Sequence, residues 1–233
     1  MAPICADKRN VFTFTKLEYD GTWNPYKEDW QEIKNFFKRA VNIRCKEQVT
    51  VVKLDSKELF LNPFLVIIGD KSLPKFSTSE KENLLHFLNG GGILFINDTS
   101  ISRNSLFDAS IRTLFKEILT NNRLEVIPDT HAVYKSFYLI RIVSGRRLIF
   151  PYLEGIFIDG NLRVIYSRND LLGVWIKDAL GNYLYDCFPG GYEQRKEAFK
   201  LTVNILVYTV TGTYKEDVIH KPFIERKTYD LFK

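Results

Sequence analysis

The sequence predicts an α/β fold in which helices cover both faces of a mainly parallel, doubly wound sheet. Two observations support this prediction. Apolar segments of strand length alternate with segments of helical periodicity up to about residue 128, an order typical of parallel sheets with right-handed crossovers. Two strand segments, 64–70 and 93–97, are almost uninterrupted apolar runs, as expected for strands that are buried on both faces.

The first half of the chain gives the first three strands and the first helix. Residues 11–19 alternate and are rich in β-formers, which predicts a strand that Asp20–Gly21 ends. Residues 49–54 and 64–70 are predicted as the second and third strands. Between the first two strands, residues 27–43 are predicted to form a helix. Its apolar stripe is expected to contain Trp30, Ile33, Phe37 and Ala40.

The next predicted helix begins at a capping box made by Ser79 and Glu82. Its apolar stripe is expected to contain Leu84, Leu85 and Leu88, and Gly90 is expected to end it in a left-handed conformation. The fourth strand, 93–97, follows.

A third helix is predicted over 107–119, because its apolar side chains keep a period of about 3.6 residues. Residues 123–128 are predicted as a fifth strand, and 153–167 as two short strands around the hairpin turn Asp159–Gly160. A closing helix is predicted over 193–212, and its apolar face is expected to include Ala198, Leu201, Ile205 and Tyr208.

The chain shows no repeat, low-complexity segment or long linker, which favours a single domain over residues 11–212 followed by a polar tail, 213–233. Residues 1–10 resemble the end of a secretory signal, because small residues precede a switch to charged sequence at Asp7. A flexible cytosolic N-terminus is the alternative, and export is favoured.

Charge and apolar content exclude other classes of protein. The net charge of +5 is dispersed along the chain without a basic block, so nucleic-acid binding is not expected. No apolar run approaches the roughly 20 residues that span a bilayer. The three cysteines, Cys5, Cys45 and Cys187, lack C-x-x-C spacing, which argues against a disulfide framework or a thiolate zinc site and favours buried thiols over a single bridge.

Candidate site residues gather around the end of the fourth strand. Asn97 and Asp98 end it, and the next helix begins near Asp108, so all three are expected at the carboxyl edge, where open α/β folds bind ligands. Asp98 could orient a ligand, bind a metal or act as an acid or base. Its alternative role, which we favour from the sequence, is to cap the backbone amides of its own turn. Asp108 is interpreted as a helix-start acid, and Arg112 either pairs with it or offers its guanidinium to an anionic ligand.

Two further candidates follow later strands. His131 is interpreted as either a hydrogen-bonded structural residue or an acid–base group, and Asp170 as either a turn residue or a site wall. With Asp98 and Asp108 they would form an oxygen-and-imidazole metal set, but the spacing matches no metal signature. No metal or cofactor is therefore predicted. Glycines 90–92 precede a strand, so they do not fit a phosphate-binding loop.

Six segments follow one another along the chain: LEYDGTWNPY, LNGGGILFINDTS, LFDASIRTLFKEIL, IPDTHAVYKSFY, LEGIFIDGNLRVIYSRNDLLGVW and VNILVYTVTG with HKPFIERK. In this order they resemble the bacterial domain-of-unknown-function family numbered 4159. The resemblance extends from about Leu17 to Arg226, and it lies in the succession of segments rather than in any one of them.

The resemblance implies a flavodoxin-like, three-layer α/β/α sandwich similar to class I glutamine amidotransferases, here with a C-terminal β-hairpin and helix. In those enzymes the turn after the glycine-rich stretch and strand holds the nucleophilic cysteine. Here the turn is Asn97-Asp98-Thr99-Ser100 and contains no cysteine. The compact His-x-Glu arrangement of the amidotransferase triad also has no counterpart, so amidotransferase activity is not expected.

The family pattern also indicates site residues, from which the chain departs in places. Asn97 stands where an acid is common, Asn161 replaces an arginine, and TSISRNS replaces a glycine-rich stretch. These departures argue against an intact dinuclear or phosphate-cradling site. Asp98 and His131 are the catalytic candidates. The ligand-binding candidates are Asp20, Trp23, Asn97, Asp98, Asp108, Arg112, His131, Asp170 and Trp175.

Members of the family are typically exported or membrane-anchored, and some are encoded near or fused to von Willebrand factor A-type proteins and MoxR-type ATPases. The resemblance therefore implies a periplasmic or extracytoplasmic location and envelope partners, with a cytoplasmic location as the alternative. The leading hypothesis is an exported, non-enzymatic ligand- or protein-binding domain of a bacterial envelope complex. The alternatives are a hydrolase-like enzyme using Asp98, Asp108, His131 and Asp170, with or without a metal, and a pure scaffold.

Overall fold

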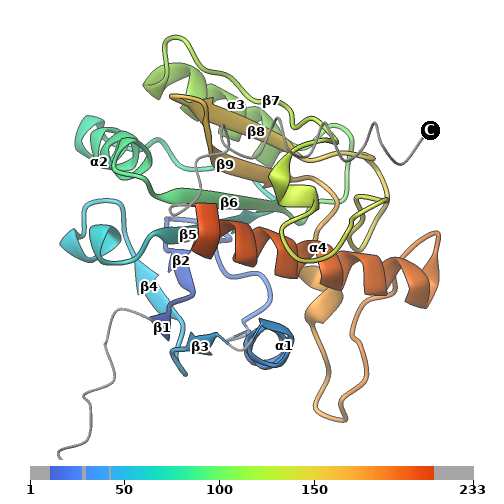
Figure 1. The fold of residues 1–233 in the computed structure, drawn as a ribbon. Helices are drawn as coiled ribbons and strands as arrows, with labels where there is room; N and C mark the ends of the chain where they lie inside the picture. Colours follow the sequence, from blue (N-terminus) through green and yellow to red (C-terminus); the bar gives the residue numbers. More distant parts are fainter. Residues whose placement is uncertain (1–10, 28–29, 42, 213–233) are drawn as a thin grey trace, which may run out of the picture.

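The computed structural model describes residues 11–27, 30–41 and 43–212 (Figure 1). The expected N-terminal segment 1–10 and C-terminal tail 213–233 lie outside the described residues. Within them, one large sheet lies between two layers of helices, so the predicted three-layer α/β sandwich is confirmed.

The described part of the main sheet has seven strands in the order β4–β2–β5–β6–β9–β8–β7. From β4 to β9 neighbouring strands are parallel, whereas β8 and β7 run antiparallel to their neighbours. In chain order the five parallel strands are arranged 2-1-3-4-5, which is the flavodoxin-like order. The bounds are β2 Thr15–Leu17, β4 Thr50–Val52, β5 Phe64–Gly69, β6 Ile93–Asp98, β7 Glu125–Val126, β8 Glu154–Ile158 and β9 Asn161–Ser167.

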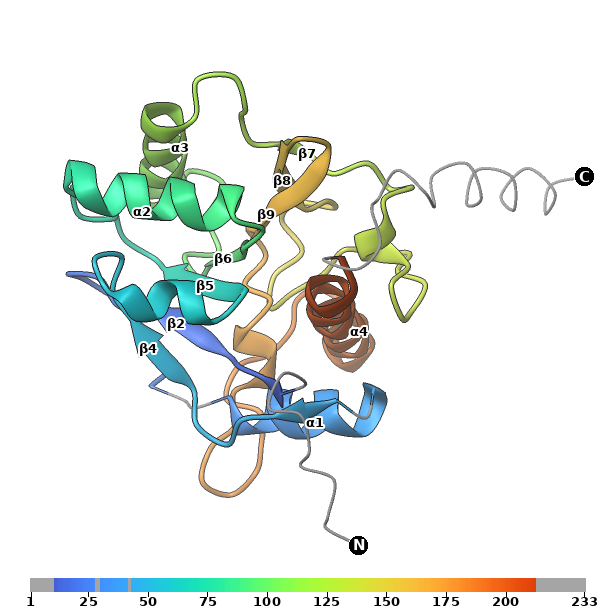
Figure 2. The ribbon, with the colours of Figure 1, turned by 60° about the vertical axis from the view of Figure 1, so that its left-hand side comes forward.

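The helices lie on both faces of the sheet (Figure 2). Helices α1 and α4 pack on one face, and α2 and α3 pack on the other. Three short 3-10 helices, η2, η3 and η4, lie in the connections of the described part of the chain. The bounds are α1 Gln31–Val41, α2 Thr78–Asn89, α3 Leu106–Ile118, α4 Gly191–Gly212, η2 Lys57–Leu61, η3 Ala132–Tyr134 and η4 Gly173–Trp175.

Strand β5 shows why the central strands are apolar throughout. Leu65 and Ile67 belong to the core under α2 and α3, whereas Val66 and Ile68 belong to the core under α1 and α4. All four side chains are buried. Because successive side chains of a strand point to opposite faces, a strand between two helical layers needs apolar residues at every position.

The predicted hairpin is confirmed, with Asp159 and Gly160 both at positive φ in its turn, as the favoured two-residue turns require. The position of the fifth parallel strand was predicted wrongly. The segment 123–128 contributes only the exposed, antiparallel β7, while the second hairpin strand, β9, pairs in parallel with β6. Strand β9 takes this place because its apolar residues are buried on both faces of the sheet.

The first predicted strand, 11–19, is divided in the structure. Strand β1 (Val11–Phe12) pairs with β3 (Arg44–Cys45) in a separate two-stranded parallel sheet. Strand β2 pairs with β4 and β5 in the main sheet. Continuous β-forming residues therefore predicted the extended conformation, but the change of pairing partner depends on contacts far along the chain.

Both ends of α2 differ from the sequence prediction. The capping box is made by Ser77 and Glu80, which exchange hydrogen bonds between side chain and backbone. Ser77 and Ser79 both have a glutamate three residues later, and only the extended backbone of Ser77 makes it the cap. At the other end Gly90 has φ of −74°, and Gly91 adopts the left-handed conformation with φ of +97°.

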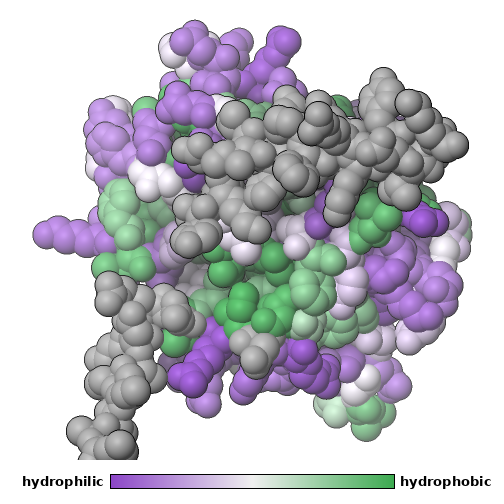
Figure 3. Space-filling view, in the orientation of Figure 1, coloured by the Kyte–Doolittle hydropathy of each residue, from purple (hydrophilic) through white to green (hydrophobic). Residues whose placement is uncertain are grey.

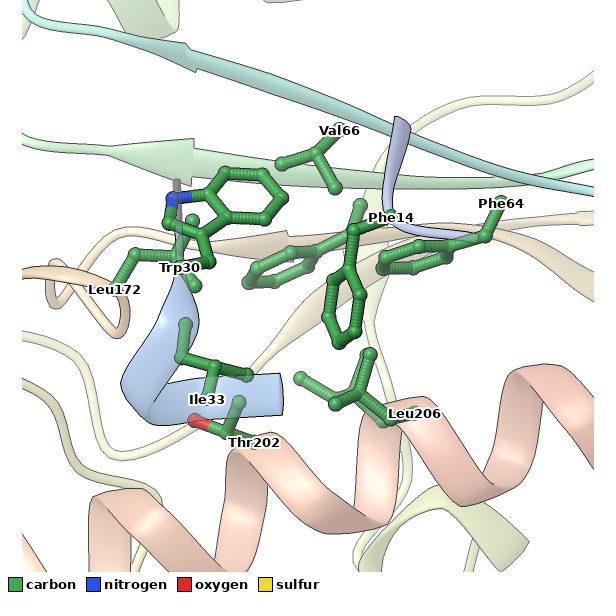
Figure 4. A pocket seen from close by; sticks show the side chains of 10 residues that line it. Phe14, Trp30, Ile33, Phe64, Val66, Leu172, Thr202 and Leu206 are labelled. Carbon is green, nitrogen blue, oxygen red and sulfur yellow. The ribbon is translucent and has the colours of Figure 1, made fainter. Parts of the chain in front are cut away.

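Helix α4 presents the expected apolar face, because Ala198, Leu201, Ile205 and Tyr208 are buried against the sheet and its connections. The space between α4, α1 and the sheet is filled by side chains such as Phe14 (Figure 4). What is left is an apolar cavity of about 10 Å³, which could hold at most a single water. This part of the core is therefore not a ligand site.

No helix in the described part of the chain is long and apolar enough to cross a membrane.

In the orientation of Figure 1, the molecular surface has a hydrophobic central area, with hydrophilic side chains along its lower and right-hand margins (Figure 3). Cys45 and Cys187 are free thiols; Cys187 is buried as expected, whereas Cys45 is only half-buried. Burial raises the pKa of each. Cys5 lies outside the described residues.

Replacing Thr202 by valine should destabilise the fold. The Thr202 hydroxyl accepts a hydrogen bond from the buried Trp175 Nε1 at 3.1 Å, so the variant leaves a buried donor unpaired, at a cost of about 1–3 kcal/mol. Urea unfolding measures this. Thr113→Val is the control. Like Thr202, Thr113 donates its hydroxyl to the carbonyl four residues earlier, but Thr113 is exposed. Equal losses of unfolding free energy in the two variants would contradict this role of Thr202.

Candidate functional site

Strand β6 delivers two polar side chains to opposite faces of the sheet. Asn97 and Asp98 are both fully buried at its carboxyl end. Asn97 contacts Asp170, whereas Asp98 contacts Tyr166 on the α3 side. This separation follows from the alternation of side chains along a strand, and it divides the expected site into two clusters.

The first cluster surrounds the carboxylate of Asp170, which has no exposed surface. Its Oδ1 accepts hydrogen bonds from Asn97 Nδ2 at 3.0 Å and from the N–H of Gly173 at 3.1 Å. Its Oδ2 accepts from Tyr26 Oη at 2.6 Å and from Arg146 Nε at 2.5 Å. We call these five residues the Asp170 cluster. Four donors and one positive charge thus compensate the buried carboxylate.

Backbone geometry fits the Asp170 cluster closely. Asp170 itself has φ of +54°, which aspartate tolerates better than most residues. A Cβ on Gly173 would lie 2.2 Å from Asp170 Oδ2, so only glycine fits there. On the other side, a Cβ on Gly145 would lie 2.2 Å from the Asn169 carbonyl oxygen. The loop that places Arg146 therefore approaches the end of β9 at a distance that only glycine allows.

The second cluster joins α3 to the sheet through four charged side chains. Asp108 Oδ2 lies 3.0 Å from Arg112 Nε and 3.4 Å from Arg168 Nη2. Glu154 Oε2 lies 2.7 Å from Arg112 Nη2 and 4.0 Å from Arg168 Nη1. We call this set the α3 network. Each acid faces both arginines, so the charges of these four residues balance.

Asp98 lies next to the α3 network. Its Oδ1 accepts from the N–H of Ser100 at 2.8 Å, and its Oδ2 accepts from Tyr166 Oη at 3.4 Å. Burial raises the pKa of Asp98 above its ordinary value, and hydrogen bonds from Ser100 and Ser105 with the positive charge of Arg168 oppose that shift only in part. Burial, helped by the Asp98 charge, also raises the pKa of Tyr166.

Two hydroxyl groups near the end of β2 make hydrogen bonds to β5 and to the residue that follows it. The hydroxyl of Tyr19 donates to the carbonyl of Ile68 at 2.7 Å, and that of Thr22 donates to Asp70 at 2.6 Å. These residues flank the point between β2 and β5 where the strand order reverses, which is the usual ligand position in this topology. Burial and the nearby Asp70 raise the pKa of Tyr19.

His131 lies away from these clusters. Its Nδ1 caps η3 by accepting from the backbone N–H two residues later. Its ring packs on Phe157 and Tyr208, with centroids 5.5 and 5.4 Å away. Phe157 is three residues along β8 from Glu154, or about 10 Å toward the other end of the sheet. The structure therefore does not assemble the expected catalytic pair of Asp98 and His131.

Three other candidates lie in the connections between strands and helices. Trp175 is buried, stacks on Phe199 at 3.9 Å and donates to Thr202, so it belongs to the core. Asp20 is exposed in the loop after β2, and Trp23 is half-buried beside the α2–α3 core. The ligand-binding roles of Asp20 and Trp23 stay predictions.

Sequence reasoning missed several residues of both clusters. Glu154 and Arg168 left a signal, because each is a charge at the end of an apolar strand segment, and a buried charge needs an opposite partner. Arg146 belongs to the only adjacent pair of arginines in the chain. Tyr26 left no local signal, since its partner Asp170 lies 144 residues away.

Within the described residues, no three histidine, cysteine, aspartate or glutamate side chains gather as a metal site. A general acid or base must reach a proton of its substrate. Here Asp98 and Asp170 are fully buried, and Asp108 is held by arginines. This arrangement is suited to fixing loops and α3 rather than to transferring protons.

Two open grooves lie beside these clusters. The arginine groove has a volume of about 420 Å³ and is lined by Ile101, Arg103, Arg147, Leu148, Ile149, Phe188 and Pro189. The α4 groove has a volume of about 470 Å³ and includes Leu139, Arg141, Ile142, Glu193 and Gln194. Leu148 and Pro189 line both grooves, so the two form one continuous surface, which we call the edge surface.

Replacing Asp170 by asparagine should destabilise the protein by about 3 kcal/mol, because the Arg146 guanidinium, whose side chain is only 17% exposed, loses its charged partner. Urea unfolding of the full chain measures the loss. Asp159→Asn is the matched control, since Asp159 lies exposed in the hairpin turn at a φ that asparagine tolerates. Losses of the same size in both variants would contradict the role assigned to Asp170.

The buried Asp98 should make stability depend on pH. Its raised pKa means that the folded state holds the Asp98 proton more tightly than the unfolded chain, so stability is lost as pH rises from the ordinary value of 3.8 through the folded value. Asp98→Asn removes this loss, so the stability of the variant relative to the parent should increase across that range. Carbon-13 NMR titration of Asp98 gives the pKa directly, and a value at or below 3.8 would contradict the assignment.

The family model described as Domain of unknown function (DUF4159) matches residues 13–210 of the chain. The matched range includes the Asp170 cluster, the α3 network and both grooves. A search of curated proteins gave no match. Because the matched range covers well over half of the sequence, the chain belongs to the DUF4159 family.

Proposed function

We propose that this chain is a non-enzymatic binding domain of a bacterial envelope complex, and that it recognises its ligand or partner through the edge surface. The observation that supports this proposal best is the state of the acidic groups at the carboxyl edge. Asp170 and Asp108 are each paired with arginine, and Asp98 is fully buried. Groups held in this way stabilise a scaffold, and the neighbouring surface is left to make contacts.

The edge surface has the composition of a contact site. Several large apolar side chains on it are well exposed, including Leu139 at 60%, Ile142 at 54% and Phe188 at 60%. Leu148, at 40% exposed, joins the two grooves. Single exposed apolar residues are ordinary, but a contiguous group with charged neighbours is typical of a binding surface.

The location and partner class are further parts of this proposal. The signal-like segment 1–10 and the family resemblance support export and an extracytoplasmic location. The same resemblance supports a partner among von Willebrand factor A-type or MoxR-associated proteins. Fractionation of cells that express the full precursor tests export, and an unprocessed cytoplasmic product would contradict it.

One observation favours a second candidate function, a hydrolase-like activity centred on Asp98. Carboxyl groups with a raised pKa are common at catalytic sites, and burial raises the pKa of Asp98. Structural ion-pair networks perturb carboxyl groups in the same way, and the α3 network is such a surrounding. The absence of a cysteine in the turn after β6 and the position of His131 favour the binding function instead.

The proposed function predicts that contact with a partner depends on the edge surface. We expect the full chain to bind a von Willebrand factor A-type protein from the same genome, and Leu148→Asp to weaken this binding at least tenfold, by about 1.4 kcal/mol or more. Isothermal titration calorimetry measures the affinity. Leu61→Asp is the matched control, because Leu61 is 75% exposed but precedes β5, at the opposite end of the sheet.

Two results would contradict the proposed function. Equal affinities of the Leu148 and Leu61 variants would exclude the edge surface as the contact. Turnover of chromogenic ester or phosphate substrates that is lost in a folded Asp98→Asn variant would establish the hydrolase-like activity instead.

A further inference from the structure

Two arginines at the arginine groove differ from the others at the carboxyl edge. Arg112, Arg146 and Arg168 are paired with carboxylates. Arg103 and Arg147 line the groove, and within the described residues neither forms an ion pair. The lining residues of the groove include no acid. The groove therefore presents positive charge without a counter-charge from its own walls.

The side chains of these two arginines are positioned by aromatic rings. The guanidinium of Arg103 lies 5.5 Å from the ring centroid of Phe150, and that of Arg147 lies 5.1 Å from that of Phe188. A guanidinium that contacts a ring by its face keeps its N–H edges available. The ring contacts also restrict the two arginine side chains before a ligand binds, so binding costs less conformational entropy.

The backbone of both walls is fixed. Arg147 donates its N–H to the carbonyl of Asn169 at 3.1 Å, and Leu148 donates to the carbonyl of Phe188 at 3.2 Å. On the opposite wall, the carbonyl of Arg103 accepts from Arg168 Nη2 at 2.8 Å. Asn169, which precedes Asp170, and Arg168 of the α3 network thus fix the backbone of Arg147 and Arg103.

The rest of the groove is apolar. Ile101, Leu148, Ile149 and Phe188 line it, and Phe188 is 60% exposed. A volume of about 420 Å³ is within the range of small-molecule sites. Two guanidinium groups that line one groove with apolar walls are suited to a ligand with an anionic end and an apolar body.

We propose that the arginine groove binds an organic anion, in which a carboxylate or phosphate contacts Arg103 and Arg147 and an adjoining apolar group lies against Leu148 and Phe188. The proposal rests on the binding function proposed above and names the chemistry of the ligand. A free cation would be repelled by the two arginines. A bare inorganic anion would leave the apolar walls without contacts.

Titration of the full chain with four probes tests the proposal: phenyl phosphate, 3-phenylpropionate, the neutral 3-phenylpropanol and inorganic phosphate. We expect at least one aromatic anion to bind more tightly than both the neutral alcohol and inorganic phosphate. The anion that binds more tightly decides between phosphate and carboxylate. Affinity should fall about tenfold in Arg103→Met and in Arg147→Met, as for the loss of one charged hydrogen bond.

Arg141→Met is the matched control, because Arg141 is an exposed arginine that lines only the neighbouring α4 groove. Methionine keeps most of the aliphatic stem, and circular dichroism verifies that each variant is folded. Equal anion affinity in the parent, Arg103 and Arg147 variants would overturn the proposal, as would equal affinity for 3-phenylpropionate and 3-phenylpropanol.

The results separate this inference from the proposed function. If Leu148→Asp abolishes partner binding while the arginine variants keep their affinity for the probes, only the anion site is overturned. If the chain hydrolyses phenyl phosphate, and does so less well in the arginine variants, the groove is supported and the non-enzymatic function is overturned.

Discussion

The buried carboxylate of Asp170 is the constraint on which the carboxyl edge of this protein depends. Its partners come from the end of β6, from the loop after β2, from the loop before β8 and from the start of η4. A fully buried charge is stable only if opposite charge and hydrogen bonds surround it. The four segments must therefore meet at one point, and their meeting gives the surrounding loops a defined position.

The same requirement explains how charge is distributed at this edge. Because Asn97 and Asp98 point to opposite faces of β6, the acids of this edge are divided between the Asp170 cluster and the surroundings of the α3 network. The adjacent Arg146 and Arg147 are divided in the same way. Arg146 enters the cluster, while Arg147 lies over Phe188 at the groove. Neutral clusters inside thus leave Arg103 and Arg147 at the groove without an ion pair among the described residues.

Local sequence patterns predicted most of the fold. The apolar runs of β5 and β6, the helical period of α3 and the Asp159–Gly160 turn each depend on burial or backbone preference within a few residues, and the structure confirms them. The failures concern choices between similar local options. Ser77 and Ser79 offer the same capping spacing, and both 123–128 and 161–167 resemble strands. Only pairing with β6 decides that β9, and not β7, is the fifth parallel strand.

The sequence by itself determined the layered α/β architecture, the position of Asn97 and Asp98 at a strand end and the absence of a cysteine in the turn that follows. These properties depend on short-range periodicity and on residue identity. The tertiary structure alone decided which polar groups meet. Tyr26 reaches Asp170 across 144 residues of chain, and His131 packs on Phe157 instead of joining Asp98. The physical reason is that side-chain contacts between distant segments follow from how the whole sheet and its covering helices pack, which no local pattern specifies.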